Sequence, residues 1–293
     1  MSGKGKKQKT DTLLPGPECS GKQDPEASPG INHWQILSDE MVLSILRLLP
    51  QKDLVTVSKI NKKLRDLTRD DSLWTELTLD YEDIKQNTDS CRKLVDRCKK
   101  LASLKITNKY QNWKRLDIMS VVIRAKSSLK SLEVDDSMRD WTPAAMSKLG
   151  CLENLSSLAL SFNSKPNAVN GYAGAKMLKE LANLDQLEKL KLVIAHKISC
   201  MLDYQESQNS RVIASAVMKK VFQHIQQLQK LKKVDIFPCM AYGFYQYGLV
   251  EALAGNNPGL KVLRLKRLPS LSDKTVEVLV SSCPGLKELQ VQF

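Results

Sequence analysis

The sequence predicts an α/β fold: a short all-helical segment followed by a curved stack of strand–helix units, with parallel strands inside and helices outside. Two observations lead to this prediction. A six-residue pattern, Leu-x-x-Leu-x-Leu or a close variant, recurs eight times from Trp74 onward. A dense run of apolar residues with helical spacing precedes it, between Ile31 and Asp80.

The recurring pattern has a nearly constant spacing. Its middle apolar residues are separated by 27, 28, 26, 32, 44, 29 and 26 residues, so five of the seven intervals lie between 26 and 29. These middle residues are Leu77, Leu104, Leu132, Leu158, Leu190, Val234, Leu263 and Leu289. Such a period is typical of a leucine-rich-repeat solenoid, in which each unit buries its apolar face against the next unit. We therefore expect a repeat domain of about eight units over residues 76–293.

Side chains alternate between the two faces of a strand, so both Leu residues of each Leu-x-Leu point to the core. The residues beside them point to the opposite face. On the fifth to seventh strands this face carries five cations against one carboxylate, Asp235. The candidate substrate-binding residues on these strands are Lys189, Lys191, Lys233, Phe237, Arg264 and Lys266.

The net charge of +13 lies entirely in residues 81–293. Residues 1–30 carry five Lys and four acidic residues, and residues 31–80 carry seven basic and eight acidic residues. We hypothesise that the basic strands receive an acidic or phosphorylated segment of a protein substrate. The alternatives are a solvated face with counter-ions and a nucleic-acid surface. Nucleic acid is less favoured, because aromatic residues do not alternate with the basic positions as they do in stacking platforms.

Two irregular stretches accompany the basic strands. The 44-residue interval holds a polar insertion around residues 196–209, and the next unit contains five Phe and Tyr residues between Phe237 and Tyr247. Long insertions in repeats often bind partners. The aromatic run fits either a peptide anchor or local core packing.

Residues 1–30 combine Lys with Gly, Ser, Pro and Gln and contain no aromatic residue, so we expect a disordered basic tail. The run from Lys4 to Lys9 fits a nuclear address. The chain contains neither an apolar run of 18 residues nor the apolar stretch of a signal peptide. We expect a protein of the cytoplasm and/or nucleus, without a membrane partner.

Residues 31–75 have the pattern of a small helical domain. Ser38 is placed to cap a helix that runs to Pro50, and a second helix follows from Asp53, with apolar residues at 54, 57, 60, 64 and 67. The first helix is apolar nearly all round, so it needs covering on more than one face. We therefore expect this domain to contact both the repeats and a partner.

These residues resemble an F-box over about forty positions without gaps. The leucine-rich repeats directly behind them are typical of one F-box subfamily. The family usually has Pro where Ser38 stands, a small apolar residue where Asn61 stands, and Trp where Leu64 stands; we expect the last two changes to alter packing. The resemblance rests on four runs: Trp34–Pro50, Asp53–Ser58, Lys62–Leu67 and Asp71–Trp74.

The resemblance implies a role in ubiquitination. F-box proteins dock onto the Skp-type adaptor of an SCF-type (cullin-RING) ubiquitin ligase, and through it onto the cullin and RING subunits, and they present a protein substrate for ubiquitination and degradation. An alternative is a helical cap that only shields the first repeat. The residues implied in adaptor binding are Leu37, Ser38, Glu40, Ile45, Leu46, Leu49, Leu54 and Val57.

The sequence predicts no catalytic site, metal site or cofactor. It contains no Gly-rich phosphate loop, no Gly-x-Ser-x-Gly and no His-Glu-x-x-His. The seven cysteines include no Cys-x-x-Cys pair, and there are three histidines. We therefore expect reduced thiols and a non-catalytic receptor subunit.

Overall fold

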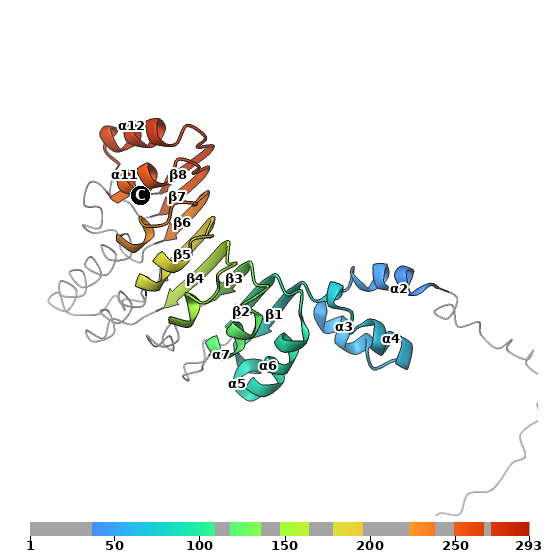
Figure 1. Ribbon diagram of the computed structural model, residues 1–293. Helices are drawn as coiled ribbons and strands as arrows, with labels where there is room; N and C mark the ends of the chain where they lie inside the picture. The colour runs from blue at the N-terminus through green and yellow to red at the C-terminus, as the bar shows by residue number, and fades with distance from the viewer. Residues whose placement is uncertain are drawn as a thin grey trace, which may run out of the picture.

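The computed structural model describes residues 37–108, 118–135, 147–163, 178–195, 223–237, 249–266 and 271–292. These residues form a group of short helices followed by one eight-stranded sheet, in which the order of the strands is their order in the chain. Figure 1 shows the strands following one another along a curved row, with the helical group beside the first strand. The tail, the insertion at 196–209 and residues 238–247 of the aromatic run lie outside the described residues.

Every strand is parallel to its neighbours. The register aligns the middle apolar residue of each predicted copy with that of the next, from Leu77 opposite Leu104 to Leu263 opposite Leu289. The prediction of eight parallel strands at these positions is therefore confirmed. The strands are β1 (Glu76–Asp80), β2 (Ser103–Thr107), β3 (Ser131–Val134), β4 (Ser157–Asn163), β5 (Lys189–Ala195), β6 (Lys233–Phe237), β7 (Val262–Lys266) and β8 (Glu288–Gln292).

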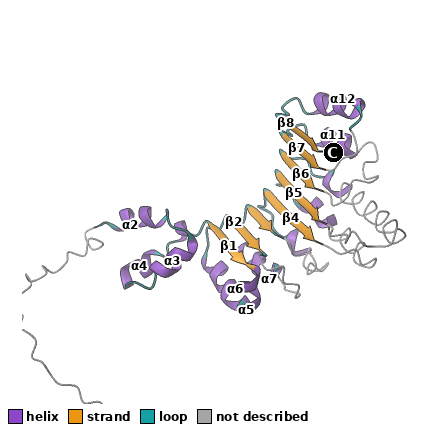
Figure 2. Cartoon of the chain, turned by 180° about the vertical axis from the view of Figure 1, so that it is seen from behind, coloured by secondary structure: helices purple, strands orange, loops and turns teal. Residues whose placement is uncertain are grey.

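One apolar core runs along the sheet. In β1 and β2 the buried residues alternate with more exposed ones, as the period of two requires. The buried side joins the core formed with helical residues such as Val95 and Leu279. Figure 2 shows the helices beside the strands in the reverse view. The helices are α5 (Tyr81–Gln86), α6 (Thr88–Arg97), α7 (Met119–Val122), α11 (Leu249–Asn256) and α12 (Asp273–Ser282), with three short 3-10 helices, η1 (Asp71–Leu73), η2 (Ile123–Ala125) and η3 (Leu178–Asn183).

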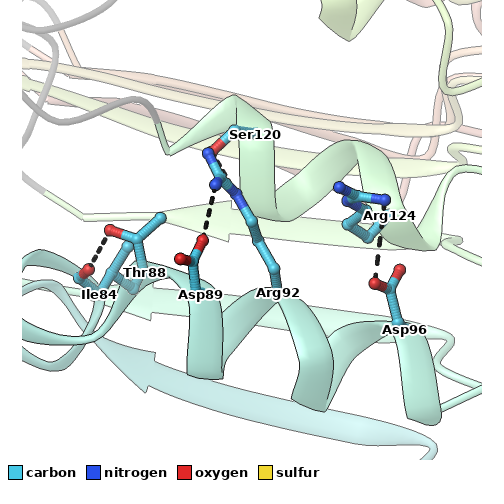
Figure 3. Close-up of polar contacts among 7 residues, drawn as sticks. All are labelled: Ile84, Thr88, Asp89, Arg92, Asp96, Ser120 and Arg124. Carbon is cyan, nitrogen blue, oxygen red and sulfur yellow. Dashed lines mark hydrogen bonds and ion pairs between the residues drawn. The ribbon is translucent and has the colours of Figure 1, made fainter.

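Polar contacts join neighbouring units on the helical side. Arg92 of α6 donates to the Ser120 hydroxyl of α7 from Nη2 at 2.8 Å and from Nε at 3.2 Å. Arg124 lies 3.8 Å from a carboxylate oxygen of Asp96 (Figure 3). The exposed Arg124–Asp96 pair contributes about 0–1 kcal/mol, so it aligns the units more than it stabilises them.

A fully buried Asn257 links two units further along. Its Oδ1 accepts a hydrogen bond from the backbone N–H of Leu231 at 2.8 Å, and its Nδ2 donates to the carbonyl oxygen of Leu253 at 2.9 Å. Buried backbone groups need partners, and this side chain provides them where the chain turns between a helix and the next strand.

The N-terminal group contains three helices, α2 (Asp39–Leu46), α3 (Gln51–Val57) and α4 (Lys62–Leu67). Two expectations are wrong here. The first helix ends at Leu46 rather than at Pro50, and Pro50 is instead the N-cap of α3, which begins at Gln51. The expected second helix is two helices, because Asn61 caps α4 by accepting a hydrogen bond from Leu64 N at 2.8 Å. The capping role of Ser38 is confirmed: its hydroxyl accepts from Met41 N at 3.3 Å.

The helical group is joined to the sheet at Trp74, which is buried and donates from Nε1 to the carbonyl oxygen of Thr68 at 2.7 Å. The guanidinium of Arg97 lies 5.5 Å from the centre of the Trp74 ring, a cation–π contact from α6. Gln51 of α3 also reaches the backbone of β1. The two parts therefore share a packed junction.

Candidate functional site

Two surfaces are candidate interaction sites, and the first lies on the helical group. Large apolar side chains are exposed there although the group is small; Leu48 is 83% exposed and Ile60 is 66% exposed. A cluster of exposed apolar residues is characteristic of an interaction surface. We call it the apolar helical surface, and it comprises Met41, Ile45, Leu48, Val55 and Ile60.

The structure separates the predicted adaptor-binding residues into two sets. Leu46 and Leu54 are only 1% and 2% exposed, because they form the inner side of α2 and α3. These two side chains hold the helices together and do not offer free surface. The predicted residues that are at least partly exposed are Leu37, Ser38, Glu40, Ile45, Leu49 and Val57.

Sequence reasoning did not select Met41, Leu48, Val55 and Ile60 as site residues. In α2, Val42 and Leu46 are four positions apart and share the buried face, so Met41 and Ile45 lie on the outer side. This division depends on where the helix ends and on which face meets the other helices. The apolar run from 41 to 49 alone does not reveal it.

The three departures from the F-box pattern have local structural roles. Ser38 caps α2 and Asn61 caps α4. Leu64 is buried against the other helices. The group is further tied together by Lys63, whose ammonium donates to the carbonyl oxygen of Leu37 and pairs with Asp39, both at 3.1 Å. Asn61 is thus a helix cap rather than a packing residue.

The second surface is the sheet face opposite the buried anchors, which we call the open face. On β5 the exposed side chains of Lys189 and Lys191 flank the buried Leu190. The register places Lys189 beside Lys233, and Lys191 beside Asp235. Neighbouring strands are about 4.8 Å apart, so the predicted cations form one cluster.

The carboxylates divide these cations into paired and unpaired groups. Arg264 donates to Glu288 from Nε at 2.6 Å and from Nη2 at 2.9 Å, and its Nη1 lies 3.7 Å from Asp235. Lys233 lies 3.5 Å from Asp235. The hydrogen bonds that Arg264 donates to Glu288 hold the pKa of Glu288 below its ordinary value and raise the pKa of Arg264.

Asp235 is the buried centre of this cluster. Its side chain is only 7% exposed, and no hydrogen-bond donor among the described residues reaches its Oδ1. Its charge faces Lys233 and Arg264, so both cations are already engaged within the sheet. Of the five predicted cations, Lys233 and Arg264 are therefore paired with carboxylates of the sheet, Asp235 and Glu288.

The remaining three cations have no ion pair within the described part of the chain. Lys189 and Lys191 extend from β5, and Lys266 places its ammonium 4.9 Å from the centre of the Phe237 ring. This cation–π contact joins Lys266 of β7 to the half-buried Phe237 of β6. The opposite half of the sheet is different, since Lys105 is neutralised there by Glu133 at 2.8 Å and the hydrogen bond raises its pKa.

Within the described ranges, no group of three or more His, Cys, Asp or Glu residues could hold a metal ion. No described helix is both long enough and apolar enough to cross a membrane. Of the described cysteines, Cys91, Cys98 and Cys283 are buried, Cys151 is exposed, and all four are free thiols.

Comparison with known proteins identifies the helical group. A sequence model of the F-box-like family matches residues 34–80, which cover α2, α3, α4 and the first strand. A search of curated proteins found no match for the chain. The chain therefore contains an F-box-like domain, followed by an all-parallel sheet of eight strands.

Proposed function

We propose that this protein is the substrate-recognition subunit of an SCF-type ubiquitin ligase. The F-box-like domain docks the Skp-type adaptor and, through it, the cullin and RING subunits. The strands behind it form a leucine-rich-repeat domain that binds the protein substrate for ubiquitination. In this role the chain is non-catalytic and acts in the cytoplasm and/or nucleus.

The observation that carries the proposal is the apolar helical surface within the segment that matches the F-box-like family. Exposed apolar side chains on short helices cost solvation free energy unless a partner covers them. The surface lies on helices whose inner side is already occupied by Leu46 and Leu54. A second protein is therefore the natural partner of the outer side.

The repeat assignment rests on the alignment of eight equivalent anchors across an all-parallel sheet with sequential strand order. Such a sheet leaves one face open along its full length, and repeat proteins use such extended surfaces for binding. The second candidate function is an independent binding scaffold that does not join a ligase. It is favoured if the helical group serves only to cover the first strand.

The test is co-purification of the full chain with a Skp-type adaptor. We expect wild type to form a stoichiometric complex and the double variant Ile45→Asp, Leu48→Asp to lose it, because both changes place charge on the apolar helical surface. Val280→Asp is the matched control, since Val280 is 65% exposed on α12, away from that surface.

Circular dichroism must show that the double variant retains its helices. Absence of a complex with folded wild-type protein would contradict the ligase role and favour the scaffold. Leu46 and Leu54 are unsuitable for this test because changing them removes core contacts.

A further inference from the structure

We propose that the open face at β5 binds an acidic peptide segment, with Lys189 and Lys191 as its main anchors. The inference deepens the proposed function and rests on it only for the role of the bound protein as a substrate. The chemistry required of the segment is clustered negative charge, supplied by carboxylates or by phosphate groups.

The two lysines are available for this role because neither forms an ion pair within the described part of the chain; the nearby Glu188 and Asp235 pair with Lys232 and Lys233. Both are exposed, both lie on the same side of β5, and they are two residues apart, which is about 7 Å along an extended strand. Two ammonium groups at that separation can reach a single phosphate or two neighbouring carboxylates. By contrast, Arg264 uses three of its nitrogens on Glu288 and Asp235.

The neighbouring strand leaves room for the segment. The register places Ser157 beside Lys189, and Ala159 beside Lys191. These side chains are small and uncharged, so they neither pair with the lysines nor fill the space above β4. The hydroxyl of Ser157 adds a hydrogen-bond donor at the same level.

Asp235 fixes the position of the negative charge. This buried carboxylate lies directly beside Lys191 in the register. It also engages Lys233 and Arg264, so the cations left for an acidic group lie on β5, and we place that group over β4 and β5. Lys266 of β7, whose ammonium lies over the Phe237 ring of β6, supplies a third cation beyond Asp235, and the ring offers a contact for an apolar residue of the segment.

The experiment measures fluorescence anisotropy of short labelled Gly/Ser peptides with the purified full chain. One peptide carries three glutamates, one three phosphoserines and one three glutamines. We expect one or both acidic peptides to bind about tenfold or more tightly than the glutamine peptide. Preference for the glutamate or the phosphoserine peptide identifies the source of the negative charge.

Charge reversal provides the residue-level test. The double variant Lys189→Glu, Lys191→Glu should weaken binding of the preferred peptide about tenfold or more. The milder Lys189→Gln, Lys191→Gln should lie between it and wild type. The control Lys126→Glu, Lys274→Glu changes net charge equally at two exposed positions, and should stay within about twofold of wild type.

Equal binding of all three peptides, or an unchanged affinity in the charge-reversed variant, would overturn the proposal. So would tighter binding of a single-stranded oligonucleotide than of either acidic peptide. Adaptor co-purification of the same variant separates the two proposals: a variant that keeps the adaptor but loses the peptide supports this inference. If wild type binds the peptide but forms no complex with the adaptor, that result contradicts only the ligase role.

Discussion

The side-chain carbonyl of Gln51 accepts a hydrogen bond from the backbone N–H of Thr78 at 2.9 Å. The amide nitrogen of the same side chain donates to the carbonyl oxygen of Glu76. These backbone groups lie on the outer edge of β1, where the sheet has no further strand. One glutamine of α3 therefore satisfies a donor and an acceptor that an edge strand leaves open, and it ties the F-box-like domain to the sheet.

Removing this side chain should weaken the junction. We expect Gln51→Ala to lower the free energy of unfolding by about 1–2 kcal/mol, because two hydrogen bonds to the backbone are lost at an edge that water can reach. Urea denaturation measures the change, and hydrogen exchange should show faster exchange of the Thr78 amide. Gln227→Ala is the control, since Gln227 is exposed. Unchanged exchange at Thr78 would show that the contact does not protect the edge.

Trp74 tests the other part of the junction. Trp74→Phe keeps an aromatic ring but removes the donor to the carbonyl oxygen of Thr68, a buried residue. Leaving that acceptor unpaired should cost about 1–3 kcal/mol. Trp74→Ala should cost about 3–5 kcal/mol, because packing is lost as well. Equal stability of Trp74→Phe and wild type in urea denaturation would contradict this account.

Truncation to Ala should destabilise the protein strongly at Leu46 and hardly at all at Leu48. Leu46→Ala removes a core side chain and should lower the free energy of unfolding by about 2–5 kcal/mol. Leu48→Ala should change it by no more than about 0.5 kcal/mol, since Leu48 is exposed in the isolated chain. Thermal unfolding measures both. A large loss for Leu48→Ala would mean that the chain itself uses this side chain.

The cysteines should differ in reactivity. Burial raises the pKa of Cys98 to about 11, and it also raises the pKa of Cys91 and of Cys283. At pH 8 only on the order of one in a thousand Cys98 side chains is then a thiolate, the reactive form. Iodoacetamide labelling followed by peptide mass spectrometry should modify the exposed Cys151 before the buried Cys91, Cys98 and Cys283. Equal labelling of Cys98 in folded protein would contradict its burial.

The contact between Glu288 and Arg264 predicts a pH dependence. The pKa of Glu288 is lowered from an ordinary value of 4.5, mainly by the hydrogen bond from Arg264. A lowered folded-state pKa contributes stability that is present above the ordinary value and is lost as pH falls through the folded value. Glu288→Gln should therefore be less stable than wild type at pH 6, and the difference should shrink below about pH 4. A difference independent of pH would contradict the ion pair.

The strands were predictable from the sequence because two independent periods coincide there. The alternation within Leu-x-Leu assigns the faces, and the recurrence every 26–29 residues aligns one strand with the next. A slip of one residue would turn Leu104 to the open face, so the apolar pattern allows a single register.

The helical group was harder to predict. Apolar residues at 54, 57, 60, 64 and 67 continue the helical period across a break. The interruption depends on a single cap, Asn61, whose side chain competes with the backbone for the hydrogen bond of Leu64. Apolar periodicity continues through this helix break, so it predicts a helical position for the exposed Ile60, which lies in the turn before α4.

The open face shows a second limit of prediction from the sequence. Its residues followed from alternation, but which cations remain free depends on cross-strand partners. The register brings Asp235 beside Arg264, and Glu288 beside Val262, within reach of the guanidinium. Composition counts these charges without pairing them, so only the folded structure distinguishes the paired Arg264 from Lys191.

The sequential strand order has a kinetic consequence. Each strand pairs only with the strands before and after it in the chain, so closing each pair joins segments roughly 30 residues apart rather than distant ends. Low separation between contacting residues favours fast folding, and growth can spread outward from any unit that forms first. Damage to one unit then leaves folded stretches on either side of it, and the F-box-like domain and the basic strands can fail independently.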